Sequence, residues 1–215
     1  MTREAHRGTI RAALVHGVVL GVALATSGAA PWVASAHSVP LHTAARASAA
    51  CAPVDRPFRP TTLSIDGVLD ATKVLARGQD PNGVPTPPPL TRRGKWQLAW
   101  DKASGVRPGD TIGVVRLTAH TYPRDHPRHG PEAPALGNLL LARLRTGAPL
   151  EVTGAKGERL CYRVTRRQQV RATDSLSGYY DTIGPPRLAI LVCSGKRRGP
   201  GNWSHRTIWF AVPLA

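Results

Sequence analysis

Three side chains in the C-terminal two thirds of the sequence have the types needed for thiol-based acyl transfer. Cys193 follows the apolar run Leu188–Val192, and His120 ends the strand-like run 112–120 in the same manner. Arg206 stands at the start of a third apolar run. A thiolate nucleophile needs a nearby imidazole to exchange its proton. The developing oxyanion needs a donor, and a guanidinium stays charged at any ordinary pH. Cys193 alone is weak evidence, because an isolated cysteine is more often a small buried hydrophobe.

Other residues compete for the same chemistry. His205 adjoins Arg206 but would point to the opposite face of a regular strand, so we prefer His120 as the base. Ser194 does not lie in a G-x-S-x-G motif, the sequence that forms the nucleophile turn of many serine hydrolases. The loop 121–134 carries Asp125, His126, His129 and Glu132, which could suggest a metal site. This loop is broken by prolines and has no recognised ligand spacing, so we predict neither metal nor cofactor.

The elements that must position these residues are mostly short strands. Gly 21 and Pro 20 make a turn-rich composition, which argues against a helical bundle. Short β-branched and apolar runs separated by turn residues predict strands at 61–65, 72–76, 94–100, 112–120, 149–154, 159–170, 187–195 and 205–214. The one helix signal is 137–147, where leucines follow a 3.6-residue period and Gly147 marks the stop. This pattern predicts a mainly β domain over 61–215, as a closed or nearly closed barrel or a sandwich.

The N-terminus reads as an export signal or a membrane anchor. Arg3, Arg7 and Arg11 precede the apolar stretch 12–33, and residues 34–36 offer an A-x-A cleavage site. A cleaved signal peptide over 1–36 and an uncleaved anchor both fit, because about 20 apolar residues can span a bilayer. A buried helix of the folded domain is the third reading. The Ala/Ser/Pro-rich segment 37–60 then serves as a tether.

The charge of the chain indicates anionic surroundings. Lys+Arg is 29 and Asp+Glu is 13, so the net charge is +16. Aromatic residues make up only 5%, which argues against a base-stacking nucleic-acid binder. For an exported protein the relevant anions are membrane lipids and anionic wall polymers. The run Lys196–Arg198, expected in a loop between nucleophile and arginine, could also influence substrate entry.

Three cysteines leave at least one unpaired. Cys161 lies in an expected strand and either packs in the core or pairs with Cys51, since export permits disulfides. The second arrangement would close a loop of about 110 residues and leave Cys193 free.

The ordered set of these features resembles the sortases, the cysteine transpeptidases of Gram-positive cell surfaces. The resemblance covers most of 61–214, from TTLSIDGVLDATKVLARGQDPNGVPTPP through RLTAH, ALGNLLLARLRTGAPLEVTGAKGERLCYRVT and LAILVCSG to GNWSHRTIWFAVP. The order His, Cys, Arg matches the family, as do the spacings 193 − 120 = 73 and 206 − 193 = 13. The arrangement of these features along the sequence most resembles that of the class F sortases of actinobacteria.

The resemblance implies an eight-stranded β-barrel with one or two short helices. It implies His120 as general acid/base, Cys193 as nucleophile and Arg206 as support for the oxyanion and substrate. Val192 and Ser194 flank the cysteine and are the candidate substrate-binding residues. Sortases commonly have Thr before the cysteine, so Val192 is a departure; Ser194 or backbone N–H groups could supply the missing donor.

The resemblance also implies partners and a location. The substrates would be exported proteins with a C-terminal LPxTG-like sorting signal, and the acceptor a peptidoglycan-precursor or other wall amine. The enzyme would work outside the cytoplasm of a Gram-positive bacterium, held at the membrane if its anchor is uncleaved, with no nucleic-acid partner. The alternatives are a non-catalytic basic wall-binding module on a degenerate sortase fold and a peptidoglycan transpeptidase. The latter typically places His and Gly close before its cysteine, a pattern this chain lacks.

Overall fold

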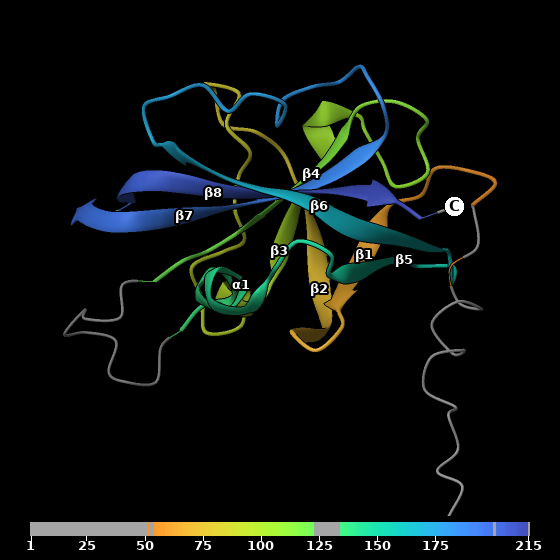
Figure 1. The fold of residues 1–215 in the computed structure, drawn as a ribbon, viewed down its shortest axis with the longest axis horizontal. Coiled ribbons are helices and arrows are strands. Elements are labelled where there is room, and N and C mark those ends of the chain that lie inside the picture. Colours follow the sequence, from red (N-terminus) through yellow and green to blue (C-terminus); the bar gives the residue numbers. More distant parts are fainter. Residues whose placement is uncertain (1–50, 52–53, 123–133, 200, 215) are drawn as a thin grey trace, which may run out of the picture. The chain divides into compact units, whose positions relative to one another are not determined.

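The expected strands close into one barrel in the computed structural model, which describes residues 51, 54–122, 134–199 and 201–214. The strand order is β1-β2-β3-β4-β7-β8-β6-β5 (Figure 1). The strands are β1 (Pro60–Ile65), β2 (Leu69–Arg77), β3 (Leu98–Asp101), β4 (Val114–Ala119), β5 (Pro149–Gly154), β6 (Arg159–Arg171), β7 (Arg187–Gly199) and β8 (Asn202–Pro213). One α-helix, α1 (Leu136–Arg143), and two 3-10 helices, η1 (Gly94–Trp96) and η2 (Lys102–Ser104), complete the described elements. The prediction of a mainly β, eight-stranded closed barrel is confirmed.

Parts of strands β4, β7 and β8 pack apolar side chains on both faces, which explains their hydrophobic runs. One face belongs to the larger core cluster, which includes Leu117, Ile190 and Trp209. The other face belongs to a second cluster formed by Val114, Tyr179, Ala189, Ile208 and Phe210. Tyr179 comes from the connection between β6 and β7, so this connection lies over the outer face of the three strands. The sheet that carries the candidate residues is therefore packed from both sides.

A buried ion pair ties β3 to β4 beneath the same connection. Arg116 Nη1 donates to Asp101 Oδ2 at 3.2 Å, and both side chains are almost fully buried. Asp101 also accepts a hydrogen bond from Gln79 Nε2 at 2.7 Å. Arg116 donates to the carbonyl of Tyr180 and lies over its ring. This pair holds the β6–β7 connection against the barrel.

Several expected elements have different bounds. The strand expected at 112–120 covers only Val114–Ala119, so His120 lies just after it and not within it. The strand expected at 94–100 begins only at Leu98, because Gly94 opens a 3-10 turn whose N–H donates to Thr91 Oγ1 at 2.9 Å. A Cβ on Gly94 would lie 2.0 Å from the Pro89 carbonyl oxygen, so the proline-rich segment can approach only a glycine here. The helix ends at Arg143, since Leu144 is already extended and packs in the core.

The loop expected at Lys196–Arg198 is instead part of a strand. β7 continues to Gly199, with Arg197 opposite Trp203 and Gly199 opposite Asn202. A bulge after Ser194, where Gly195 has φ +78°, allows the pairing to resume. Lys196–Arg198 are exposed and charged and show no apolar alternation. The hydropathy pattern therefore did not predict that β7 extends through them.

The N-terminal part of the described chain is fastened to the barrel. Cys51 and Cys161 form a disulfide across 110 residues of sequence, which confirms the second of the two readings of Cys161. Phe58 is buried in the core, so barrel contacts begin before residue 61. The expected signal or anchor over 1–36 lies outside the described residues. Within the described part, no helix is long and apolar enough to cross a membrane.

Candidate active site

Strand register places the three chemical candidates in one row. β4 and β7 run parallel and their last pair is Ala119 with Val192, so His120 directly follows the end of β4 and Cys193 directly follows Val192 on β7. β7 and β8 are antiparallel with Cys193 directly opposite Arg206. Neighbouring strands lie about 4.8 Å apart. Cys193 and Arg206 are therefore direct cross-strand neighbours, and His120 leaves the adjacent strand β4 at the same end of its pairing with β7.

Alternation along β7 and β8 assigns the side chains of Cys193 and Arg206 to the outer face of the barrel, and continuing the alternation of β4 by one residue assigns His120 to the same face. Paired residues share a face and successive residues alternate. Ile190 and Val192 point into the main core, whereas Ala189 and Leu191 belong to the outer cluster. Cys193 continues the outer series and is partly exposed, as are His120 and Arg206. Because all three are accessible at one place, a substrate carbonyl could meet them together.

The His120 ring is held by the proline-rich connection between β2 and β3. Its Nε2 lies 2.6 Å from the carbonyl oxygen of Pro88. A carbonyl can only accept, so Nε2 carries the proton and Nδ1 is the nitrogen left to exchange one. The contact fixes both the tautomer and the tilt of the base, a role that the sequence alone did not assign to Pro88.

The backbone of His120 is held by the start of α1. Gly137 N–H donates to the His120 carbonyl at 2.8 Å, and a Cβ on Gly137 would lie 2.5 Å from that oxygen. Asn138 Oδ1 accepts from Tyr122 N–H and Nδ2 donates to the Tyr122 carbonyl, each at 2.9 Å. Gly137 and Asn138 are thus positioning residues that sequence reasoning missed. A Gly-Asn pair at a helix start, in place of better helix formers, was the available signal.

Arg206 is oriented by its own strand. Its Nη1 donates to the carbonyls of His205 at 3.0 Å and of Trp203 at 3.3 Å. A guanidinium has five N–H donors, so these two contacts leave others for a ligand. Within the described residues Arg206 forms no ion pair, so its charge acts on the neighbouring thiol rather than on a carboxylate.

The resting protonation states of the pair follow from burial. Burial raises the pKa of the Cys193 thiol, and the Arg206 charge lowers it only in part. Burial lowers the pKa of His120, and the hydrogen bond to Pro88 opposes this shift. Both shifts favour the neutral forms, thiol and imidazole, at neutral pH. The thiolate–imidazolium form that acyl transfer needs is therefore a minor species.

Val192 and Ser194 lie on the other face of β7. Val192 is fully buried in the main core. Ser194 is buried as well, and its hydroxyl oxygen lies 2.9 Å from Thr207 Oγ1 and 3.3 Å from Gln169 Nε2. Neither side chain shares a face with Cys193. Their role in substrate binding stays a prediction, and it would have to rest on backbone groups.

The competing candidates are placed as follows. His205 is paired with Ser194 rather than with Cys193, and its Nδ1 lies 2.8 Å from Ser204 Oγ. Alternation along β8 therefore puts it on the face away from the thiol, as expected. His126, His129, Asp125 and Glu132 lie outside the described residues. Among the residues that are described, no three His, Cys, Asp or Glu side chains gather in a way that could hold a metal ion.

Comparison with known proteins shows the fold. No protein-family model matches the sequence, and no curated protein does. Among solved structures, a complex of Streptococcus agalactiae sortase C1 with MTSET aligns at TM-score 0.51 and 18% identity, over 72% of this chain and 66% of that one. Sortase C1 from Streptococcus suis aligns at 0.50 and 15%, over 74% of each chain. A lid mutant of Corynebacterium diphtheriae sortase A aligns at 0.50 and 18%, over 74% and 72%.

The chain therefore has the fold of the sortases. It spans just under two thirds of the Streptococcus agalactiae protein. The structures it resembles are of sortases A and C, so the class F assignment stays a prediction.

Proposed function

We propose that this protein is a sortase-type cysteine transpeptidase. The observation that carries the proposal is the row of His120, Cys193 and Arg206, which lie on or directly after three adjacent strands of a sortase fold. The row sets a nucleophile between a base and a permanent cation, which is the minimum that thiol-based acyl transfer requires.

In the first half-reaction, the Cys193 thiolate attacks the scissile carbonyl of the substrate. A C–S bond forms and the carbonyl electrons move to oxygen, where the Arg206 guanidinium donates to the oxyanion. The C–N bond then breaks as His120, protonated on Nδ1, gives that proton to the leaving amine. The products are a thioester on Cys193, a free amine and a neutral imidazole.

In the second half-reaction, an acceptor amine attacks the thioester. Neutral His120 takes the proton from the attacking nitrogen, and the C–S bond breaks to release thiolate. The imidazolium–thiolate pair is restored, so no other reactant is consumed. Water in place of the amine would give hydrolysis by the same steps.

The substrate and location rest on the resemblance. We propose an LPxTG-like sorting signal at the C-terminus of exported proteins, and a cell-wall amine as acceptor. The basic N-terminus followed by an apolar stretch supports work outside the cytoplasm, as a secreted or membrane-anchored protein. Class F of the actinobacteria remains the proposed subtype.

The test uses the oxidised full-length chain with a fluorogenic LPxTG-type peptide, with and without an amine acceptor. We expect cleavage, and a ligated product when acceptor is present. Cys193→Ala and His120→Ala should abolish both, while His205→Ala serves as the matched histidine control and should retain them. Cleavage that survives Cys193→Ala would refute the assignment of the nucleophile.

A folded chain that cleaves no member of a randomised peptide library would refute the proposal. That result would instead support the non-catalytic wall-binding module, for which Val192 beside the cysteine and the raised pKa of the Cys193 thiol are the supporting observations.

A further inference from the structure

Three neighbouring strands of the barrel carry positive charge without any negative charge. β6, β8 and β7 lie side by side, and none of them contains Asp or Glu. Their cations are Arg159, Arg163, Arg166, Arg167 and Arg171 on β6, Arg187, Lys196, Arg197 and Arg198 on β7, and Arg206 on β8. Within the described part of the chain, only Arg159 and Arg187 of this set form ion pairs. No carboxylate of the described residues forms an ion pair with the other cations of this set.

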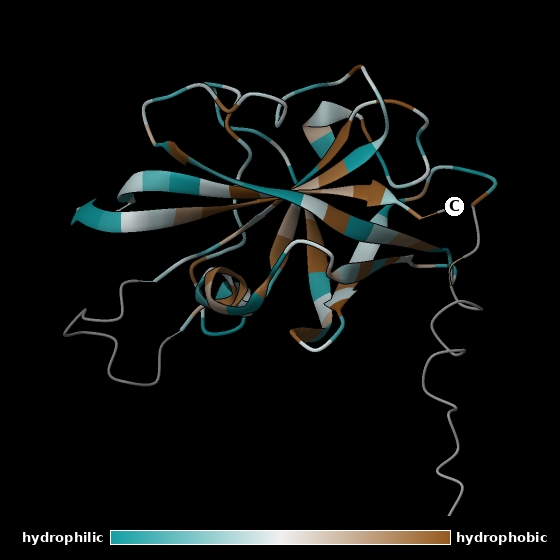
Figure 2. Cartoon of the chain, viewed as in Figure 1, coloured by the Kyte–Doolittle hydropathy of each residue, from teal (hydrophilic) through white to brown (hydrophobic). Residues whose placement is uncertain are grey.

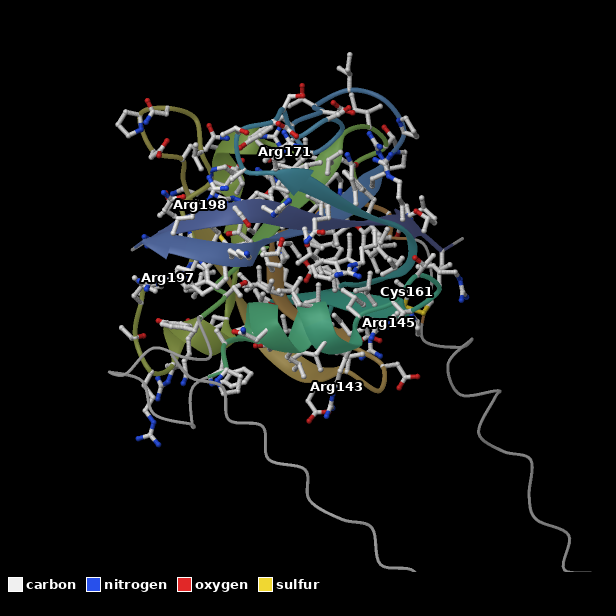
Figure 3. The ribbon with its side chains drawn as sticks, turned by 60° about the vertical axis from the view of Figure 1, so that its left-hand side comes forward. Arg143, Arg145, Cys161, Arg171, Arg197 and Arg198 are labelled. Atoms are coloured by element: carbon white, nitrogen blue, oxygen red, sulfur yellow. A yellow bond between two sulfur atoms is a disulfide. The ribbon has the colours of Figure 1, made fainter. Side chains whose placement is uncertain are left out.

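The charge is most exposed at the end of the β7–β8 hairpin. Lys196, Arg197 and Arg198, here called the cationic hairpin, are all exposed. Figure 2 shows the hydrophilic end of the hairpin, and Figure 3 places Arg197 and Arg198 there, with Arg171 at the end of β6. Arg171 lies opposite His205 on β8, so a fourth cation borders the base of the hairpin.

Strand pairing fixes the position of the cationic hairpin relative to the thiol. The three cations follow Cys193 on the same strand, and pairing with β8 continues past them to Gly199. At about 3.3 Å per residue, Lys196 to Arg198 lie ~10–17 Å from Cys193 along β7. An anion bound there would be held within roughly 10–17 Å of a thioester on Cys193.

The chemistry of the hairpin favours a hydrated polymer over a membrane surface. Interfacial membrane binding usually adds a buried apolar face to its basic residues. The exposed large apolar side chains of the described residues are Val84, Leu90, Trp96, Ile112, Tyr180, Ile183 and Val212, none of which lies on the hairpin end. Arginine, with its planar fork of donors, matches the oxygens of a phosphate group.

We propose that the cationic hairpin binds a phosphodiester-linked anionic polymer of the cell wall and holds it beside the catalytic cysteine. The proposal rests on the proposed function for the meaning of this location, but the binding itself requires no catalysis. Bound polymer would concentrate the enzyme at the wall, where the acceptor amines are, because polyanion contacts raise local concentration and encounter rates.

The test measures binding of the full-length chain carrying Cys193→Ala to poly(glycerol phosphate), by fluorescence titration between 50 and 300 mM NaCl. The test variant adds Lys196→Gln, Arg197→Gln and Arg198→Gln. The matched control removes the same charge elsewhere, with Lys73→Gln, Lys102→Gln and Arg143→Gln. All three control residues are exposed, and no hydrogen bond of their side chains is seen in the described residues.

We expect the test variant to bind at least about 10-fold more weakly at low salt, and the control variant less than 2-fold. The slope of log K against log [NaCl] should fall by about 2 in the test variant, since each contact with a flexible polyanion contributes ~0.7. Equal losses in both variants would overturn the proposal, because they would show an effect of net charge alone.

Two further arms decide the kind of anion. Polyglutamate of matched length should bind more weakly than poly(glycerol phosphate), and vesicles containing phosphatidylglycerol should show no dependence on the cationic hairpin. Tighter, hairpin-dependent binding to either would overturn the assignment to a wall phosphodiester. Failure of the proposed function would appear separately, as absent peptide cleavage by the chain with Cys193 intact.

Discussion

The disulfide between Cys51 and Cys161 should supply a large part of the stability of the barrel. It links two residues 110 positions apart, so it closes a loop that spans most of the described elements. The chain-entropy relation gives a loss of about 16 cal/mol/K in the unfolded state, or about 4.8 kcal/mol at 25 °C. For a domain of this size, each kcal/mol moves Tm by roughly 2–4 °C. We therefore expect reduction to lower Tm by about 10–19 °C.

Thermal unfolding followed by circular dichroism, with and without a phosphine reductant, measures this shift. Cys51→Ser should unfold at the temperature of the reduced native chain and should not respond to reductant. Thiol counting in denaturant sets the baseline, with one thiol before reduction and three after it. A drop below 2 °C on complete reduction would refute the reasoning, since the loop constraint would then contribute almost nothing.

Three further outcomes follow from the site. The thiolate of Cys193 and the imidazolium of His120 must coexist, but burial raises the pKa of the thiol and lowers the pKa of the imidazole, so the reactive pair is a minor form of the proposed enzyme. We expect kcat/KM to fall below an apparent pKa under 6.5 and above one over 9.0, and pH-dependent alkylation should assign the alkaline limb to the thiol. Arg206→Gln should raise the thiol pKa in the same alkylation assay and lower kcat by about 10²–10³; an unchanged kcat would remove Arg206 from the mechanism. Asp101→Asn leaves the Arg116 guanidinium buried without its counter-charge and should cost about 3–5 kcal/mol in urea unfolding; a loss under 1 kcal/mol would show that the pair is not structural.

Much of the barrel could be predicted because its strands are marked locally. The runs that became β1, β5 and β6 are bounded by turn residues, and each appears within a few residues of its expected bounds. The chemical residues were found because His120 and Cys193 each end an apolar run, where a side chain emerges from the core. Their adjacency could not be read from the pattern, since it depends on the parallel pairing of β4 with β7.

The features that hold the site in place carried weaker signals. The contact between Pro88 and His120 joins residues 32 positions apart. The sequence of a proline-rich segment does not indicate which distant residue it will contact. The extension of β7 through Lys196–Arg198 depends on cross-strand pairing with β8 rather than on an apolar pattern. Position 137 requires glycine because a Cβ there would collide with the backbone carbonyl of His120. In the sequence, this requirement is visible only as a glycine near the start of a helix.

The β4–β7 pairing determines when the proposed active site is complete during folding. Cys193 meets Arg206 through a hairpin of 13 residues, but it meets His120 only after a parallel pairing that spans 73 residues has formed. Long-range parallel pairings form slowly, because the entropy of closing the loop is lost before the contacts form. For the export proposed above, a chain that emerges unfolded would carry a thiol beside a cation but without its base. In the transpeptidase proposed above, the base would join the thiol only when the barrel closes, so the completion of folding would set the onset of catalysis.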